Sequence, residues 1–211
     1  MKRIYLNILV VAVILVGLLL PFVAFPTPVY ADSWLTGFDY RVKITFDNSD
    51  SAVNLNWFPV LVHLDDSNAD WTKIQDDGDD IRFTDSNGQT LLSAELLEWD
   101  DTNDAWMYCN VTRIDAGSTT DYIYMYYGNT TVSNYWDAEA VWRSEYVAVW
   151  HFEEASGTVY DSTDNNNDSD SESGVTYGAD GVVGDCLSYD GNDYLDIGDQ
   201  ASLEFTDEFT W

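Results

Sequence analysis

Apolar and polar side chains alternate along several short stretches after residue 31, which is the pattern of strands that bury one face. In the stretch YRVKITF, Tyr40, Val42, Ile44 and Phe46 share one face, and polar side chains occupy the other. Similar alternation marks residues 58–64, 80–85, 105–114 and 121–129, and clusters of Asp, Asn, Ser and Gly separate these stretches. No long helical stripe appears. The pattern therefore predicts an all-β fold of the β-sandwich or jelly-roll type.

The stretch GDDIRFTDSNG, residues 78–88, predicts a tight hairpin. Ile81 and Phe83 are expected to face inward, while Asp80 and Arg82 face outward. The closing Asn-Gly pair, residues 87 and 88, supplies the two residue types that best tolerate a left-handed turn.

The acid pair Asp79 and Asp80 is not explained by the hairpin. These side chains either pair with Arg82 and other bases or ligate a hard cation. A short helical turn is also expected near residues 68–75, with Asn68 or Asp70 as its N-cap.

The N-terminal residues combine Lys2 and Arg3 with a long apolar run and a small residue at Ala31. This pattern predicts a secretory signal peptide, a signal helix cleaved after Ala31. An uncleaved anchor is the alternative, since the run from Ile4 to Phe25 is long enough to span a bilayer. In either case we expect the chain from Asp32 onward to be secreted or at the cell surface.

The charge balance is strongly acidic: 8 Lys plus Arg stand against 38 Asp plus Glu, for a formal net charge of -30. Such a surface repels phosphate backbones, so nucleic acid is not expected as a partner. The acid excess suits either a salt-rich exterior or a solvated surface that discourages aggregation.

The composition changes near residue 145, and a long polar loop follows at residues 161–174. We therefore predict three parts: the leader at 1–31, a first β domain at 32–145, and a second β domain at 146–211. Because the last part is short for a β-sandwich, we expect it to be incomplete and the chain to be the front of a longer protein.

Candidate catalytic residues are few. His63 and His151 lie in apolar runs and read as partly buried strand residues, and neither a nucleophile motif nor a paired-carboxylate motif accompanies them. Cys109 and Cys186 either form a disulfide or are two buried free thiols. We therefore expect no catalytic activity from this part of the protein.

Three N-x-S/T sequons, at Asn110, Asn129 and Asn167, are permitted glycosylation sites. One further surface feature is a stripe of tyrosines, since Tyr122, Tyr124 and Tyr126 share one face of the stretch DYIYMYYGN. This face is either an exposed platform on which sugars stack, or it packs beneath another layer.

Four spaced blocks stand out between residues 78 and 142: GDDIRFTDSNGQTLL, LLEWD, AWMYCNVTRIDAGSTTDYIYMYYGN and DAEAVW. In content and order they resemble one family of secreted domains, the domain of unknown function 2341, and the resemblance extends from Leu35 to about Glu145. LLEWD departs from the family's usual W-I-E element. The family has no established activity, and the resemblance implies a surface-exposed β module of multidomain proteins in archaea and bacteria.

The remaining residues, 147–211, contain the blocks VAVWHFEEASGTVYDSTDNNN, GVVGDCLSYDGNDYLDIGD and LEFTDEFTW. In content and order these blocks resemble the start of a laminin-G-like or concanavalin-A-like jelly roll. The resemblance implies a calcium ion at the rim of the sandwich, with Asp161, Asp190, Asn192 and Asp193 as ligands. The alternative is that Asp161 caps a loop and residues 190–192 form a hairpin turn.

Three functions remain open from sequence. The first is a non-catalytic module that binds a polysaccharide or another cell-envelope component. The second is a structural spacer of a surface protein. The third is an accessory part of a secreted glycoside hydrolase. The membrane is expected as a partner only through an uncleaved leader.

Overall fold

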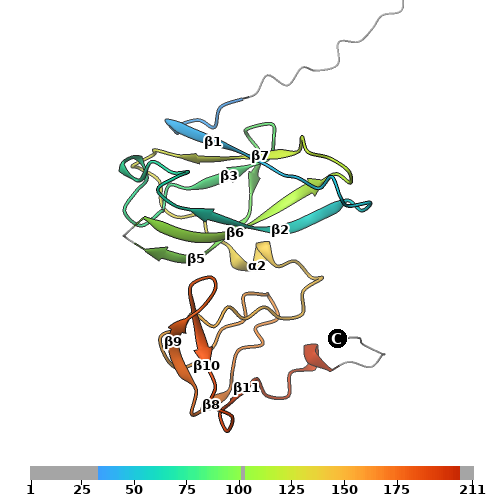
Figure 1. The fold of residues 1–211 in the computed structure, drawn as a ribbon, viewed down its shortest axis with the longest axis vertical. Helices are drawn as coiled ribbons and strands as arrows, with labels where there is room; N and C mark the ends of the chain where they lie inside the picture. Colours follow the sequence, from blue (N-terminus) through green and yellow to red (C-terminus); the bar gives the residue numbers. More distant parts are fainter. Residues whose placement is uncertain (1–32, 101–102, 205–211) are drawn as a thin grey trace, which may run out of the picture. The chain divides into compact units, whose positions relative to one another are not determined.

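A computed structural model describes residues 33–100 and 103–204 of the chain (Figure 1). The predicted signal segment at 1–31 lies outside the described residues, as does the block after residue 204. Within the described ranges, no helix is long and apolar enough to cross a membrane. The described fold is predominantly β, as predicted.

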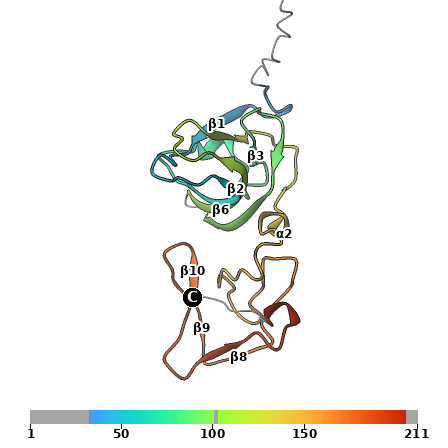
Figure 2. The same ribbon diagram turned by 90° about the vertical axis from the view of Figure 1, so that its right-hand side faces the viewer.

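Two antiparallel sheets form the first part of the fold, and Figure 2 shows them as separate layers. The four-stranded sheet has the order β1-β7-β3-β4, and the three-stranded sheet has the order β2-β6-β5. The strands of the first sheet are β1 (Tyr40–Thr45), β3 (Arg82–Thr84), β4 (Leu91–Leu92) and β7 (Tyr122–Tyr127). Those of the second are β2 (Leu55–Leu64), β5 (Ala94–Asp100) and β6 (Asp104–Ile114).

The two sheets share one apolar core. Phe83, Ile123 and Met125 come from the four-stranded sheet, and Met107 and Cys109 come from the other, each at most 1 % exposed. The period-two alternation of the sequence thus places one face of each strand in the same core. Within it, burial raises the pKa of the Cys109 thiol.

The two cysteines are both free, so the disulfide alternative is wrong. Cys109 is buried as predicted, whereas Cys186 is only partly buried.

The predicted hairpin is confirmed, with one change in how its turn is built. Strands β3 and β4 pair antiparallel, and Gly88 has a positive φ of 70°. Asn87 has no positive φ. Instead, its Oδ1 accepts hydrogen bonds from the backbone N–H groups of Gln89 and Thr90, at 2.8 and 2.9 Å. Asn87 therefore stabilises the turn through its side chain.

The expectation that Asp80 and Arg82 face outward is wrong. Asp80 is 0 % exposed and Arg82 is 8 % exposed, because the loop after β7 covers them. The Asp80 carboxylate accepts backbone hydrogen bonds from Gln75 (2.9 Å), Gly128 (2.6 Å) and Asn129 (3.0 Å). It therefore holds two loops together, and neither a salt bridge nor a cation is needed to explain it.

Short helical turns complete this part. The 3-10 turn η1 (Trp71–Lys73) begins after Asp70, whose side chain accepts from the Thr72 N–H, so the predicted N-cap is confirmed. The helix α2 (Ala138–Val141) is capped by Asp137, and it contacts β5 and β6.

The chain after residue 145 forms small antiparallel pairs. Strand β9 (Thr176–Asp180) pairs with β10 (Asp185–Ser188), and β8 (Ser171–Ser173) pairs with β11 (Tyr194–Asp196). The 3-10 turn η2 (Ala201–Leu203) follows. These pairs agree with an all-β segment, and the layout of a second jelly roll stays a prediction.

Candidate functional site

A cavity of about 180 Å³ lies beside the three-stranded sheet, where α2 covers the central strand β6. Strands β2, β4 and β6 and the end of α2 all contribute to it. Its lining residues are Trp57, Thr90, Leu91, Leu92, Ser93, Asn110, Thr112, Ala140 and Arg143. The cavity thus combines an aromatic ring, an amide, a guanidinium and three hydroxyl groups.

Asn110 is the most constrained polar side chain of this cavity, with only 4 % of its surface exposed. Its Nδ2 donates to the carbonyl oxygens of Val141 at 2.8 Å and Ala140 at 3.3 Å. These two acceptors fix the orientation of the amide, because a flipped amide would point its oxygen at two carbonyls.

The remaining amide atom, Asn110 Oδ1, is buried without a hydrogen-bond donor among the residues that the structure describes. A buried acceptor that lacks a donor costs about 1–3 kcal/mol. Asn110 Oδ1 is thus an unsatisfied hydrogen-bond acceptor. Asn110 lines the cavity, in which a ligand could supply the donor.

Trp57 forms the exposed wall of the cavity, with 46 % of its surface exposed. Its φ is 51°, and the pairing of β2 with β6 skips this residue while the register continues unchanged on both sides. A left-handed backbone in a Trp within a strand is strained by about 1–3 kcal/mol. Strain of this kind is concentrated at functional sites.

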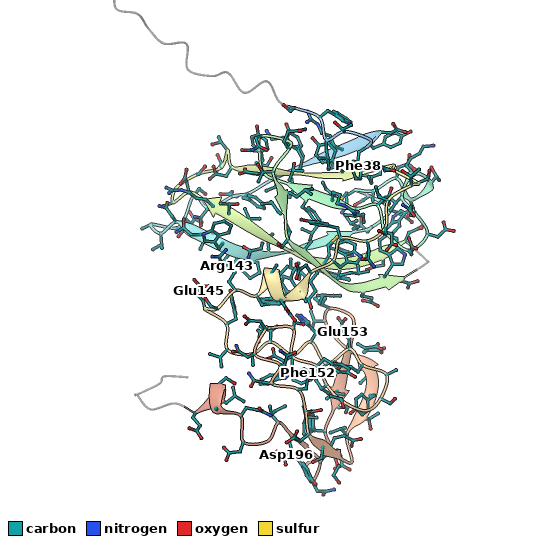
Figure 3. All side chains as sticks on the ribbon, turned by 180° about the vertical axis from the view of Figure 1, so that it is seen from behind. Phe38, Arg143, Glu145, Phe152, Glu153 and Asp196 are labelled. Carbon is teal, nitrogen blue, oxygen red and sulfur yellow. The ribbon has the colours of Figure 1, made fainter. Side chains whose placement is uncertain are left out.

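Arg143 follows α2 and is labelled in Figure 3. Its guanidinium carbon lies 4.3 Å from the centroid of the Trp57 ring, a cation–π arrangement. The contact fixes both side chains at the cavity wall. It also places a donor with a fixed positive charge beside the aromatic ring.

The arrangement suits a small polyhydroxylated ligand. An indole ring offers an apolar face, the hydroxyls of Thr90, Ser93 and Thr112 both donate and accept, and Asn110 Oδ1 needs a donor. Apolar walls with a few convergent polar groups are the usual composition of a small-molecule site.

The predicted tyrosine platform is not an open surface. Tyr124 is 7 % exposed and Tyr126 is 0 % exposed, because Phe38 and Leu35 pack on them. Figure 3 labels Phe38 in this N-terminal cover. Tyr122 is partly buried and packs against the same cluster. The packing alternative therefore describes this face.

The bases of β1 also lie on the tyrosine rings. The Arg41 guanidinium carbon is 4.0 Å from the Tyr124 centroid, and Lys43 Nζ is 3.8 Å from the Tyr122 centroid. These contacts stabilise the face through cation–π attraction.

Asp161, a predicted calcium ligand, is 8 % exposed, and both of its carboxylate oxygens accept hydrogen bonds from backbone N–H groups. Its Oδ1 accepts from the N–H groups of Val149 (2.9 Å) and Thr163 (3.0 Å), and its Oδ2 accepts from the Asn167 N–H (2.9 Å). Burial opposes ionisation, but these hydrogen bonds outweigh it and lower the pKa of Asp161. Asp161 thus caps the loop.

The other predicted calcium ligands lie in the turn before β11. Asp193 Oδ2 accepts from the Asp190 N–H at 2.7 Å, and Asp190 Oδ1 accepts from the Asn192 N–H at 3.4 Å, as in the hairpin alternative. Across the described residues, no three His, Cys, Asp or Glu side chains are grouped so that they could hold a metal ion. Calcium binding here stays a prediction.

Glu95 joins the three-stranded sheet to the segment that follows α2. Its carboxylate accepts from Trp142 Nε1 at 2.5 Å and from Ser162 Oγ at 2.6 Å, and it lies 3.2 Å from His151 Nε2. His151 is thus partly buried as predicted, although it lies outside any strand. The other histidine, His63, lies in β2 and stacks on Trp106.

Glu153 lines a cavity of about 270 Å³ beside Glu95 and His151, and Figure 3 labels it. Burial raises the pKa of Glu153 to about 7, and His151 opposes that shift. The negative charges of Glu98, Glu95 and Glu154 raise this pKa further.

The cavity beside the three-stranded sheet, called the Trp57 cavity below, has three central residues that were not predicted from the sequence: Trp57, Asn110 and Arg143. Asn110 belongs to a sequon, and a sequon indicates glycosylation, not ligand binding. Trp57 and Arg143 lie far from Asn110 along the chain. The available signal was Asn110 itself, a polar residue in the middle of the long apolar stretch 105–114.

Residues 77–172 match a family described as a domain of unknown function (DUF2341). The predicted resemblance is therefore confirmed for residues 77–145. The match begins later than the predicted Leu35 and extends past the predicted boundary at Glu145, into the segment predicted as the second domain. Searches of the curated proteins and of the solved structures gave no match. Asn110 and Arg143 lie inside the matched range, and Trp57 precedes it.

Proposed function

We propose that this chain is a non-catalytic carbohydrate-binding module of a secreted or cell-surface protein, and that the Trp57–Asn110 cavity is its sugar subsite. The observation that carries the proposal is that Asn110, whose buried Oδ1 lacks a donor, lines the same cavity as the Trp57 ring. A sugar hydroxyl would supply that donor, and the C–H face of the sugar ring would pack on Trp57.

The size of the cavity favours a single sugar ring over an extended chain segment. At about 180 Å³, it is small for a drug-like ligand. Three hydroxyl side chains and one guanidinium around it can exchange hydrogen bonds with several sugar hydroxyls. We therefore expect recognition of one terminal or branching sugar of a cell-envelope polysaccharide.

The composition supports an extracellular setting. The formal net charge of -30 disfavours anionic polymers such as nucleic acid, and the apolar leader of the sequence is typical of export. We include in the proposal that residues 147–211 begin a laminin-G-like module. The short antiparallel pairs β8–β11 and β9–β10 are compatible with it.

The test is retention of the full chain on a panel of cell-wall and algal polysaccharides and their monosaccharides. Trp57→Ala and Arg143→Gln should each weaken binding at least about tenfold, since each removes one wall of the subsite. Arg113→Gln is the matched control. It removes one positive charge from an exposed ion pair with Asp115, outside the cavity.

Equal weakening by Arg113→Gln would show that charge, not the cavity, governs retention. Normal binding by both cavity variants would place the site elsewhere. If the wild-type chain binds no member of the panel, the sugar-binding proposal is overturned and the spacer becomes the better account.

A further inference from the structure

The three sequons differ in where the structure places their asparagine side chains. N-linked glycans need an asparagine whose Nδ2 can carry a large polar group out into solvent. The same sequence motif can therefore be modified at one position and incompatible with the fold at another.

Two of the sequons are buried. Asn110 is 4 % exposed, and its Nδ2 donates to two carbonyl oxygens beneath α2. Asn167 is 0 % exposed; its Nδ2 donates to the Val147 carbonyl at 2.8 Å, and its Oδ1 accepts from Ser202 Oγ at 2.5 Å. A glycan on either Nδ2 would displace these contacts and the elements that make them.

Asn129 is placed differently, in the loop that follows β7. Its side chain is only partly buried, and the next two residues of its sequon, Thr130 and Thr131, are exposed. The Oδ1 of Asn129 accepts from Thr131 N–H at 3.0 Å and from Thr131 Oγ1 at 2.8 Å. These bonds engage only the amide oxygen.

The backbone of Asn129 is fixed by the sandwich. Its N–H donates to the buried Asp80 carboxylate at 3.0 Å, and its carbonyl accepts from Gln75 Nε2 at 2.7 Å. Its Nδ2 lies next to Gly37, and a Cβ at Gly37 would be only 3.0 Å from Nδ2. The sandwich thus holds the backbone of this partly buried asparagine in place, and the two residues that follow it are exposed.

We propose that Asn129 is the N-glycosylation site of this protein, and that Asn110 and Asn167 carry no glycan in the folded chain. In the reaction, Asn129 Nδ2 forms a bond to the anomeric carbon of an oligosaccharide carried on a polyprenyl phosphate or pyrophosphate lipid. The bond from that carbon to the lipid phosphate oxygen breaks, the amide loses one proton, and the lipid phosphate leaves. The proposal is independent of sugar binding in the Trp57 cavity.

The test is expression of the full chain with its leader in a eukaryotic secretory host, followed by glycopeptide mapping of the secreted, protease-resistant protein. We expect glycan on Asn129 alone. Asn129→Gln and Thr131→Ala should each abolish the glycan. Thr112→Val, which removes the sequon of Asn110 but keeps the asparagine, should leave the glycan mass unchanged.

A second measurement does not depend on the host. In unglycosylated protein, Asn129→Lys places a long side chain where the glycan would begin and should change the melting temperature little. Asn167→Lys should prevent cooperative folding of its segment. Folded, secreted protein with an unmodified Asn129, or with glycan on Asn110 or Asn167, would overturn the proposal, as would equal damage by the two Lys variants.

Discussion

Asp80 is fully buried, and its carboxylate accepts three backbone hydrogen bonds from two loops. The sequence showed an acid next to a hairpin, which is normally a solvated position. Whether such an acid is exposed depends on the loop after β7, which returns from a distant part of the chain. Local alternation therefore predicted the inward residues Ile81 and Phe83 correctly and placed Asp80 and Arg82 wrongly.

Replacing Asp80 by Asn should destabilise the protein by about 2–3 kcal/mol, because an amide offers one acceptor oxygen and turns an N–H group toward a backbone donor. Asp79→Asn, one residue earlier, is the control and should change stability by less than about 0.5 kcal/mol. Urea unfolding of both variants measures the difference. Equal effects would show that the backbone bonds of Asp80 contribute little.

Glu153 should make stability depend on pH, because its folded-state pKa of about 7 lies above the ordinary value for Glu. The folded state favours the neutral form of Glu153. The stability gained in this way is fully present below the ordinary pKa of Glu and is lost as pH rises through about 7. Glu153→Gln should therefore stabilise the protein at pH 8, by roughly 1–2 kcal/mol after allowing for solvent screening, and should have little effect at pH 4.

Thermal unfolding of wild type and Glu153→Gln across this pH range checks the sign. Below pH 5, Asp161 acts in the opposite direction, since its lowered pKa makes stability fall as it becomes protonated. The comparison between variant and wild type removes this shared contribution. A constant difference between the two proteins at every pH would contradict the assignment.

The turn between β3 and β4 is packed as well as bent. Gly88 has a φ of 70°, and a Cβ there would lie 2.0 Å from the Ser33 carbonyl oxygen. The N-terminal segment that covers Tyr124 and Tyr126 thus runs directly against this turn. The strands could be predicted from the alternation of apolar and polar residues. The packing of residues 33–38 over the tyrosines could not be predicted, because these residues show no periodic pattern.

Gly88→Ala should cost more than about 2 kcal/mol, since it adds a steric clash to the strain of a left-handed backbone. Gly117→Ala is a matched control. Its φ of 67° is nearly the same, but nothing lies within 4 Å of its added Cβ, so it should cost only about 1 kcal/mol. Chemical unfolding compares the two, and similar costs would show that the N-terminal cover yields without penalty.

The formal net charge of -30 makes repulsion between like charges a general destabilising force on the folded protein. The melting temperature should therefore rise by several degrees between about 0.1 and 1 M NaCl, as the Debye length falls from about 10 to 3 Å. Scanning calorimetry at several salt concentrations tests this. A melting temperature that is flat or falls with salt would show that repulsion does not limit stability.

The Trp57 cavity depends on the complete fold. Trp57, Asn110 and Arg143 come from β2, β6 and the residues after α2, and only the folded sheet brings them together. Composition and spacing predicted an exported β protein and a binding function. They could not locate a site whose three residues share no motif.

The most direct test of the account is a crystal structure of the chain with the sugar that it retains most strongly. We predict a sugar ring against Trp57 with a hydroxyl within hydrogen-bond distance of Asn110 Oδ1. A sugar bound elsewhere, for example at the turn of residues 190–193, with the cavity still empty or filled by water, would contradict the account.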